Sequence, residues 1–158
     1  MNTCLFMDID GTIADASRRF KAAGKEPRKR GPAYTKWLRR VQSRDALLED
    51  PPSEALRRLC FQLQGPAANF AYLTGRSAIY RDVTSAWLLN NSFPEAPLLM
   101  RPARSRSNPG DVKERLIKEH IKYWGFTSVI VVDDDPTGHI QEMCKRNGYT
   151  FLKATGVK

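Results

Sequence analysis

The sequence of 158 residues lacks features that would place it at or beyond a membrane. It has no run of about 18 consecutive apolar residues, which excludes a predicted membrane-spanning helix. Its amino terminus has no basic segment followed by an apolar one, the pattern that directs secretion. We therefore expect a cytoplasmic protein with no membrane partner.

Cysteine and histidine are also scarce. The three cysteines, Cys4, Cys60 and Cys144, are odd in number and far apart, which indicates a reducing compartment and not a disulfide framework. The only histidines, His120 and His139, lack the spacing of metal ligands. The sequence therefore provides no sulfur and nitrogen ligands for a zinc site.

Positive charge is concentrated in one segment. The chain is 41% hydrophobic and 27% charged, as in soluble globular proteins, and its net charge is +9. Residues 18–44 contain eleven Lys or Arg but a single acid, Glu26, and the rest of the chain is close to neutral. Such a segment is either a solvated surface or a binding site for a polyanion, and the sequence leaves both readings open.

Predicted strands alternate with predicted helices along the chain. Apolar runs at residues 4–7, 69–73 and 129–132 have the composition of buried strands. This alternation predicts an α/β fold, a Rossmann-like three-layer αβα sandwich with a central parallel sheet. We treat residues 1–158 as one domain, in which the basic segment 13–50 is a small helical and loop insertion, or cap, after the first strand.

Capping residues indicate where several helices begin. Ser53 is expected to cap one helix, and Asn108 another. Asp135 is expected to cap a third helix, which Pro136 would open. We also expect Ile79 to face the core from the helix that follows the second long strand.

Polar residues follow each of the three long predicted strands. Asp8 and Asp10 come after the first strand, Thr74 after the second, and Asp133 with Asp134 after the third. Because parallel strands end at the same edge of a sheet, these side chains should lie close together. Crowded carboxylates raise one another's pKa unless a cation is present, and Mg²⁺ prefers such oxygen ligands. The sequence therefore predicts a magnesium site.

These residues resemble the motifs of the haloacid dehalogenase (HAD) superfamily. The turn Asp8-Ile9-Asp10-Gly11-Thr12 resembles its first motif, Asp-x-Asp-Gly-Thr, while Thr74, Lys113 and the pair Asp133-Asp134 resemble the second, third and fourth. The resemblance implies a HAD-type fold and a phosphatase that forms an aspartyl phosphate. The resemblance implies that Asp8 is the nucleophile and Asp10 the general acid and base. It implies that Thr74 binds the phosphoryl group and that Lys113 compensates negative charge. The implied Mg²⁺ ligands are Asp8, Asp10 (through its carbonyl), Asp133 and Asp134. Because Asp10 must carry a proton for part of the cycle, its pKa is expected to exceed that of Asp8.

Within the superfamily, the chain is most similar to the phosphatase domain of bacteriophage-type polynucleotide kinase-phosphatases, above all over residues 70–118. The resemblance implies that Arg76, the adjoining Gly75 and Arg104 bind the substrate phosphate, and Arg18 is a further candidate. The Gly-rich phosphate loop of the kinase half does not occur in this chain, so a separate kinase or ligase is an expected partner.

The combined motifs predict a Mg²⁺-dependent phosphomonoesterase that removes 3'-phosphates from DNA or RNA ends. One alternative is a nucleotidase that acts on free nucleotides or deoxynucleotides. The other is an inactive nucleic-acid-binding module, although the intact set of motif residues counts against it.

Overall fold

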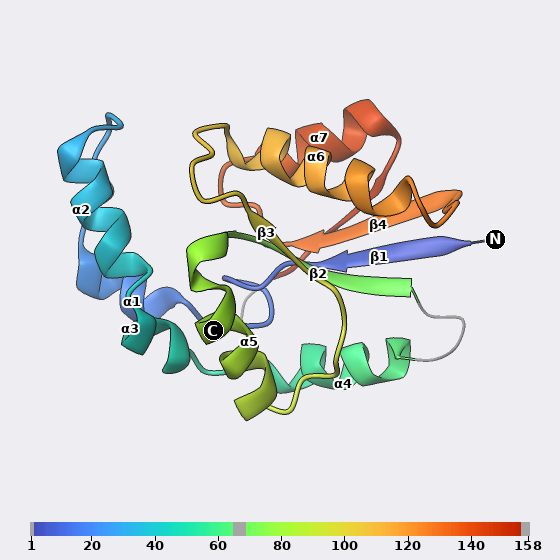
Figure 1. Cartoon of the computed structure of the whole chain (residues 1–158), viewed down its shortest axis with the longest axis horizontal. Helices are drawn as coiled ribbons and strands as arrows, with labels where there is room; N and C mark the ends of the chain where they lie inside the picture. Colours follow the sequence, from blue (N-terminus) through green and yellow to red (C-terminus); the bar gives the residue numbers. More distant parts are fainter. Residues whose placement is uncertain (1, 65–68, 156–158) are drawn as a thin grey trace.

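Five parallel strands form the centre of the molecule, shown in Figure 1. The computed structural model describes residues 2–64 and 69–155. Across the sheet the order is β3-β2-β1-β4-β5, so β1 lies in the middle between β2 and β4. The strands are β1 (Thr3–Met7), β2 (Asn69–Ser77), β3 (Leu98–Arg101), β4 (Ser128–Asp133) and β5 (Thr150–Lys153).

Helices cover both faces of this sheet. In Figure 1, α6 (Pro109–Ile121) and α7 (His139–Asn147) lie on one side, and α4 (Glu54–Leu63) and α5 (Arg81–Asn90) on the other. Phe6 of β1 packs in the cluster that includes residues of α6 and α7, whereas its neighbour Met7 packs in the cluster that includes residues of α4 and α5. Successive strand residues point to opposite faces, which explains why residues 4–7 of β1 are all apolar. The predicted three-layer α/β fold is confirmed.

Three short helices come between β1 and α4. They are α1 (Ser17–Ala23), α2 (Pro32–Val41) and α3 (Arg44–Leu48), and Figure 1 shows them beyond the carboxyl ends of the strands. The two ends of this insertion are paired: Asp15 N–H donates to the Pro51 carbonyl at 2.8 Å, and Ser53 N–H to the Ile13 carbonyl at 2.8 Å. The basic helices are thereby held close to the sheet edge where the polar residues gather.

Two predicted helix caps are confirmed and one helix start is wrong. The side chains of Ser53 and Asn108 accept hydrogen bonds from backbone N–H groups in the first turns of α4 and α6. However, α7 begins at His139, after the left-handed Gly138, and not at Pro136. The Asp135 carboxylate does accept hydrogen bonds from two N–H groups of α7, but from across the intervening turn.

Ile79 is also placed differently from the prediction. It lies in a short 3₁₀ helix (Ala78–Tyr80) before α5, and its side chain is exposed. The apolar face of α5 begins instead at Val83, because the 3₁₀ turn interrupts the helical repeat. Within the two described ranges, no helix is both long and apolar enough to cross a membrane.

Candidate active site

The turn after β1 positions Asp8. The Asp8 N–H donates to the Val132 carbonyl at 2.9 Å, which carries the pairing of β1 and β4 up to the site. The chain then folds back, because the N–H groups of Thr12 and Ala14 both donate to the Ile9 carbonyl. This turn brings the Thr12 hydroxyl to 3.3 Å from Asp8 Oδ2, to which it donates, and Asp8 is buried. Local backbone geometry therefore fixes the first carboxylate.

Lys113, near the start of α6, lies between two buried carboxylates. Its Nζ donates to Asp8 Oδ1 at 2.6 Å and to Asp133 Oδ2 at 2.5 Å. Burial lowers the pKa of Lys113, but the two carboxylates outweigh this effect and raise it. Burial and the charge of Asp133 raise the pKa of Asp8 well above its usual range, although Lys113 opposes them. The single ammonium group of Lys113 therefore does not neutralise the negative charge of Asp8 and Asp133.

Asp134 adds a third carboxylate to the group. Oxygen atoms of Asp8, Asp133 and Asp134 lie within 4.8 Å of one another. Burial and the neighbouring Asp133 raise the pKa of Asp134 to about 6. Such a cluster, built only from hard oxygen donors and short of positive charge, has the chemistry of a Mg²⁺ site. The structure thus brings together three of the four predicted metal ligands through their carboxylates.

The Asp10 carboxylate lies outside this metal-type cluster and binds two arginines. Arg76 donates to it through Nε at 3.0 Å and through Nη2 at 2.6 Å, and Arg19 donates to the same carboxylate. Both arginines also contact Asp50: Arg19 Nε donates to Asp50 Oδ2 at 2.7 Å, and Arg76 Nη2 at 3.4 Å. Arg19, Arg76 and Asp50 are buried, so these two ion-paired carboxylates hold both guanidinium groups in fixed positions.

The predicted order of the two aspartate pKa values is wrong for this arrangement. Burial alone would raise the pKa of Asp10, but Arg76 and Arg19 outweigh burial and lower it. The pKa of Asp8 is instead raised, as described above. The expectation missed this because the arginines that hold Asp10 come from other elements, Arg19 from α1 and Arg76 from the end of β2, and no local pattern shows that their side chains turn towards Asp10.

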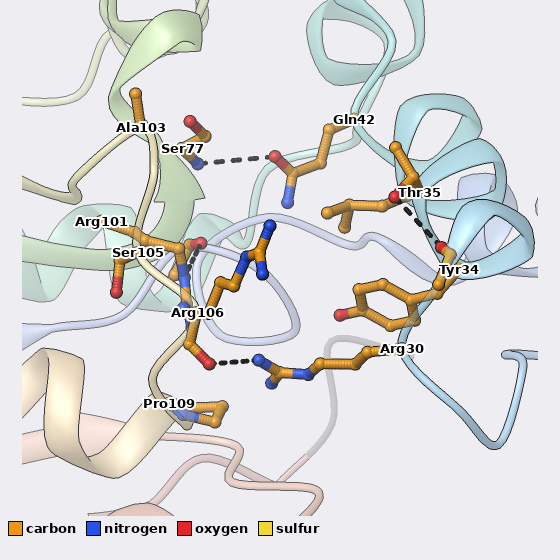
Figure 2. Close-up of a pocket in the computed structure, with 13 residues that line it drawn as sticks. Arg30, Tyr34, Thr35, Gln42, Ser77, Arg101, Ala103, Ser105, Arg106 and Pro109 are labelled. Atoms are coloured by element: carbon orange, nitrogen blue, oxygen red, sulfur yellow. Dashed lines mark hydrogen bonds between the residues drawn. The ribbon is translucent and has the colours of Figure 1, made fainter.

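The end of β2 contributes residues to two sides of the site. Thr74 is fully buried, and its hydroxyl accepts a hydrogen bond from the Arg76 N–H at 3.2 Å. Gly75 lies between them, and its carbonyl accepts from Arg101 Nε at 3.1 Å. Gly75 and Ser77 line a cavity of about 430 Å³ between α2 and residues 101–109, shown in Figure 2 and called the α2 cavity below.

Two of the predicted phosphate-binding arginines lie away from the buried carboxylates and arginines of the site. The Arg18 side chain is 78% exposed and pairs with Glu49 at 3.4 Å, and Arg104 is exposed in the loop after β3. Arg19, the neighbour of Arg18, lies in the site instead, on the face of α1 that also buries Ala23. The spacing of residues 19 and 23 was the available signal, since positions four apart share a helix face.

Asp50 is the other site residue that the sequence reasoning missed. It is the second of two adjacent acids, Glu49 and Asp50, before Pro51, with no motif around it. It reaches the site only because the insertion closes back on the turn after β1. Its role therefore follows from tertiary structure alone.

Replacing Gly11 by Ala should damage the acidic cluster. Gly11 has φ +80°, and an added Cβ would lie 2.2 Å from Asp134 Oδ2, so the Asp134 side chain would have to move. We expect a loss of stability of about 1–2 kcal/mol from the left-handed backbone, together with weaker stabilisation by Mg²⁺. Urea unfolding with and without Mg²⁺ measures both effects.

Gly24→Ala is the matched control for Gly11→Ala. Gly24 has φ +76°, but nothing lies within 4 Å of its added Cβ. It should show the backbone cost and an unchanged response to Mg²⁺. An equal response to Mg²⁺ in the two variants would contradict the close contact of Gly11 with Asp134.

Comparison with known proteins places the fold in a structural class. No protein-family model matches the sequence, and no curated protein matches it. Solved structures do match. Chains of the Pnkp1/Rnl/Hen1 complex and of the Pnkp1/Rnl/Hen1 RNA repair complex superpose with TM-scores of 0.68 and 0.67, at 18% and 17% identity over 97% of this chain. A HAD-superfamily hydrolase of subfamily IA from Geobacter sulfurreducens PCA superposes with a TM-score of 0.63, at 14% identity over 97% of this chain and 89% of its own.

These matches define the fold. It is an open parallel α/β sheet, and a HAD-superfamily hydrolase superposes on it over 97% of this chain. The predicted HAD-type fold is thus confirmed, and the matches to the Pnkp1 complexes agree with the predicted resemblance to polynucleotide kinase-phosphatases. The chain spans 46% and 42% of the matched chains in those complexes, less than half of their length.

Proposed function

We propose that the protein is a Mg²⁺-dependent phosphomonoesterase in which Asp8 is the nucleophile. One observation carries the proposal: Asp8 shares Lys113 with Asp133 and lies in a cluster of three carboxylates, at the carboxyl edge of a HAD-type sheet. Carboxylates of Asp8, Asp133 and Asp134 would hold the ion, with the Asp10 carbonyl as a further ligand. When bound, Mg²⁺ neutralises charge on the phosphoryl oxygens.

The proposed reaction has two steps. An Asp8 carboxylate oxygen attacks phosphorus, the bond from phosphorus to the ester oxygen breaks, and the leaving alcohol takes a proton from Asp10. Water then attacks the aspartyl phosphate and gives a proton to Asp10, which releases inorganic phosphate and restores Asp8. Two easier displacements replace one hard hydrolysis. The Lys113 ammonium and the Thr74 hydroxyl would stabilise the phosphoryl oxygens.

Substrate binding would also change the state of Asp10. In the structure, Arg76 and Arg19 lower its pKa and keep it ionised. A phosphate dianion would compete with Asp10 for these guanidinium groups, as Arg binds phosphate well. Loss of these contacts would raise the pKa of Asp10, so that it can carry the proton that the leaving group needs.

We propose a 3'-phosphorylated DNA or RNA end as the substrate. Basic residues of α2, Lys36, Arg39 and Arg40, line an open groove on the insertion. Such a groove suits a phosphate backbone. The structural likeness to an RNA repair complex agrees with this choice. Removal of a 3'-phosphate leaves a 3'-hydroxyl, the end that a separate ligase could then join.

A substrate panel tests the proposed function. We expect phosphate release from a 3'-phosphorylated oligonucleotide, more slowly from 3'- and 5'-mononucleotides, and none with EDTA. Malachite green detection over a range of Mg²⁺ concentrations measures all three.

Two other results of the same panel would each support one of the alternative functions. Faster release from mononucleotides would make the protein a nucleotidase. If no substrate releases phosphate while a labelled oligonucleotide binds, and salt weakens that binding, the protein is a nucleic-acid-binding module.

A further inference from the structure

The α2 cavity has a chemistry that the proposed phosphoryl site does not use. Three arginines line it: Arg30 from the segment before α2, Arg101 from the end of β3, and Arg106 from the loop that follows (Figure 2). No Asp or Glu lines it among the described residues, and none of these arginines forms an ion pair there. Such a lining selects an anion.

Positive charge in the cavity is therefore not compensated by the protein. Arg101 is half-buried and held in place, since it donates to the Gly75 and Ser107 carbonyls at 3.1 and 2.8 Å. Burial lowers the pKa of Arg101; Tyr34 opposes this shift, and the nearby Arg30 adds to it. Arg30 in turn donates to the Arg106 carbonyl, which holds Arg30 against the loop that carries Arg106. An anion bound among them would relieve this repulsion.

Two hydroxyl groups give an independent indication of a ligand. The Oγ atoms of Ser77 and Ser105 are buried, and neither has a hydrogen-bond partner among the described residues. Both serines line the α2 cavity. A buried hydroxyl without a partner costs stability, so native proteins usually satisfy it with a water or a ligand. The adjoining Gln42 uses its amide oxygen to accept from Ser77 N–H at 3.4 Å, and its NH₂ group remains a donor.

The remaining wall of the cavity is apolar and aromatic. Figure 2 shows the Tyr34 ring directed into it from α2, and Leu38 lies one turn further along the same helix. The Tyr34 ring is held by Trp37, with ring centroids 5.7 Å apart, and by the Arg30 guanidinium at 5.8 Å. A planar ring and an aliphatic side chain suit a base and a sugar. The volume of about 430 Å³ suits one small-molecule unit.

The cavity lies next to the phosphoryl site but is separate from it. Thr74 and Arg76 point to the acidic side of the β2 end, whereas the alternate residues Gly75 and Ser77 line the cavity. Neighbouring Cα atoms are about 3.8 Å apart, so the two sites are close enough to hold adjacent units of one chain. The nucleophile and Lys113 do not line the cavity, so the anion bound there is not the one to be hydrolysed.

We propose that the α2 cavity binds the nucleotide unit next to the one that bears the terminal phosphate. The three arginines would hold its internucleotide phosphate, Ser77 and Ser105 would donate to it, and Tyr34 with Leu38 would contact its base and sugar. This inference rests on the proposed function and specifies the substrate class as a polynucleotide end. It predicts a preference for a dinucleotide over a mononucleotide.

The test compares thymidine 3'-monophosphate with dithymidylate that carries a 3'-phosphate. Arg106→Ala should lower kcat/KM for the dinucleotide about tenfold more than for the mononucleotide, as expected for a hydrogen bond to a charged group. The slope of log(kcat/KM) against log salt should become shallower by about 0.7 for the dinucleotide. Arg115→Ala is the control, because it removes the same charge from an exposed position on α6 outside the cavity.

Ser105→Ala provides a second test, whose expected outcome a purely structural role of the hydroxyl would not give. Removing a hydroxyl without a partner should leave the free energy of unfolding unchanged or raised, yet lower kcat/KM for the dinucleotide about two- to tenfold. Equal losses on both substrates, or losses no larger than those of Arg115→Ala, would overturn the inference.

If neither substrate releases phosphate, the proposed function fails on its own. Binding of fluorescent oligothymidylate to the wild type and to Arg106→Ala then decides the subsite, and equal affinities would refute it.

Discussion

Asp8→Asn should abolish phosphate release while the protein stays folded. The substitution keeps the shape of the side chain but removes the oxygen nucleophile, and comparable losses of a nucleophile reduce kcat by about 10⁴-fold or more. Burial and Asp133 already disfavour the charged form of Asp8, so a neutral amide should leave the metal-free protein as stable as the wild type, or more stable. Initial rates and thermal unfolding in EDTA measure these two effects.

Mass spectrometry after acid quenching provides the direct test of the nucleophile. Wild-type protein mixed with substrate should carry a phosphoryl group on Asp8, and the variant none. Asp135→Asn is the control, because Asp135 lies next to the same carboxylates but accepts hydrogen bonds from Ile140 and Gln141 N–H. It should lose about 1 kcal/mol as a weakened helix cap and keep most of the activity. Turnover above a thousandth of wild type in Asp8→Asn would refute the assignment.

Lys113→Met should produce the largest loss of stability among the site variants. Lys113 is the counter-charge for both Asp8 and Asp133, at 2.6 and 2.5 Å, and all three side chains are buried. Leaving buried charges without a partner costs about 3–5 kcal/mol. Guanidinium unfolding in EDTA should show this loss. Mg²⁺ should then recover part of it, because a cation in the carboxylate cluster supplies positive charge again.

The matched control for this variant is Lys118→Met on the same helix. Lys118 pairs with Glu114 at 2.6 Å, but its side chain is 55% exposed, so the pair contributes at most about 1 kcal/mol. Catalysis should be lost only in Lys113→Met. If the two variants lost the same stability, or Mg²⁺ stabilised them equally, the charge balance described for the cluster would be incorrect.

Local sequence patterns predicted the strands and the turn that carry the site. The four β-branched residues at 129–132 could hardly form anything but a buried strand, and the turn Asp8–Thr12 follows β1 within a few residues. Parallel strands end at a common edge, so the meeting of Asp8 with Asp133 and Asp134 was predictable from the sequence. These features depend on short-range backbone preferences and on one general rule of topology.

Which of the basic side chains reach the site was less predictable from the sequence. The basic segment showed where cations are dense, but not which arginine is buried. Arg18 and Arg19 are adjacent in the sequence, yet one is in solvent and the other pairs with Asp10 and Asp50. The difference depends on which face α1 turns towards the sheet.

The sequence by itself determined the α/β class and the carboxylate cluster, and the resemblance to the HAD motifs indicated the approach of Lys113 to that cluster. Only the tertiary structure decided that Asp10 is held by two arginines, that Asp50 joins them, and that an arginine-lined cavity adjoins the end of β2. The reason is physical: the contacts of Asp10 and Asp50 with these arginines join residues that are 9 to 66 positions apart, on different elements of the fold. Side-chain positions across such separations follow from how the insertion packs against the sheet, and no local pattern encodes that packing.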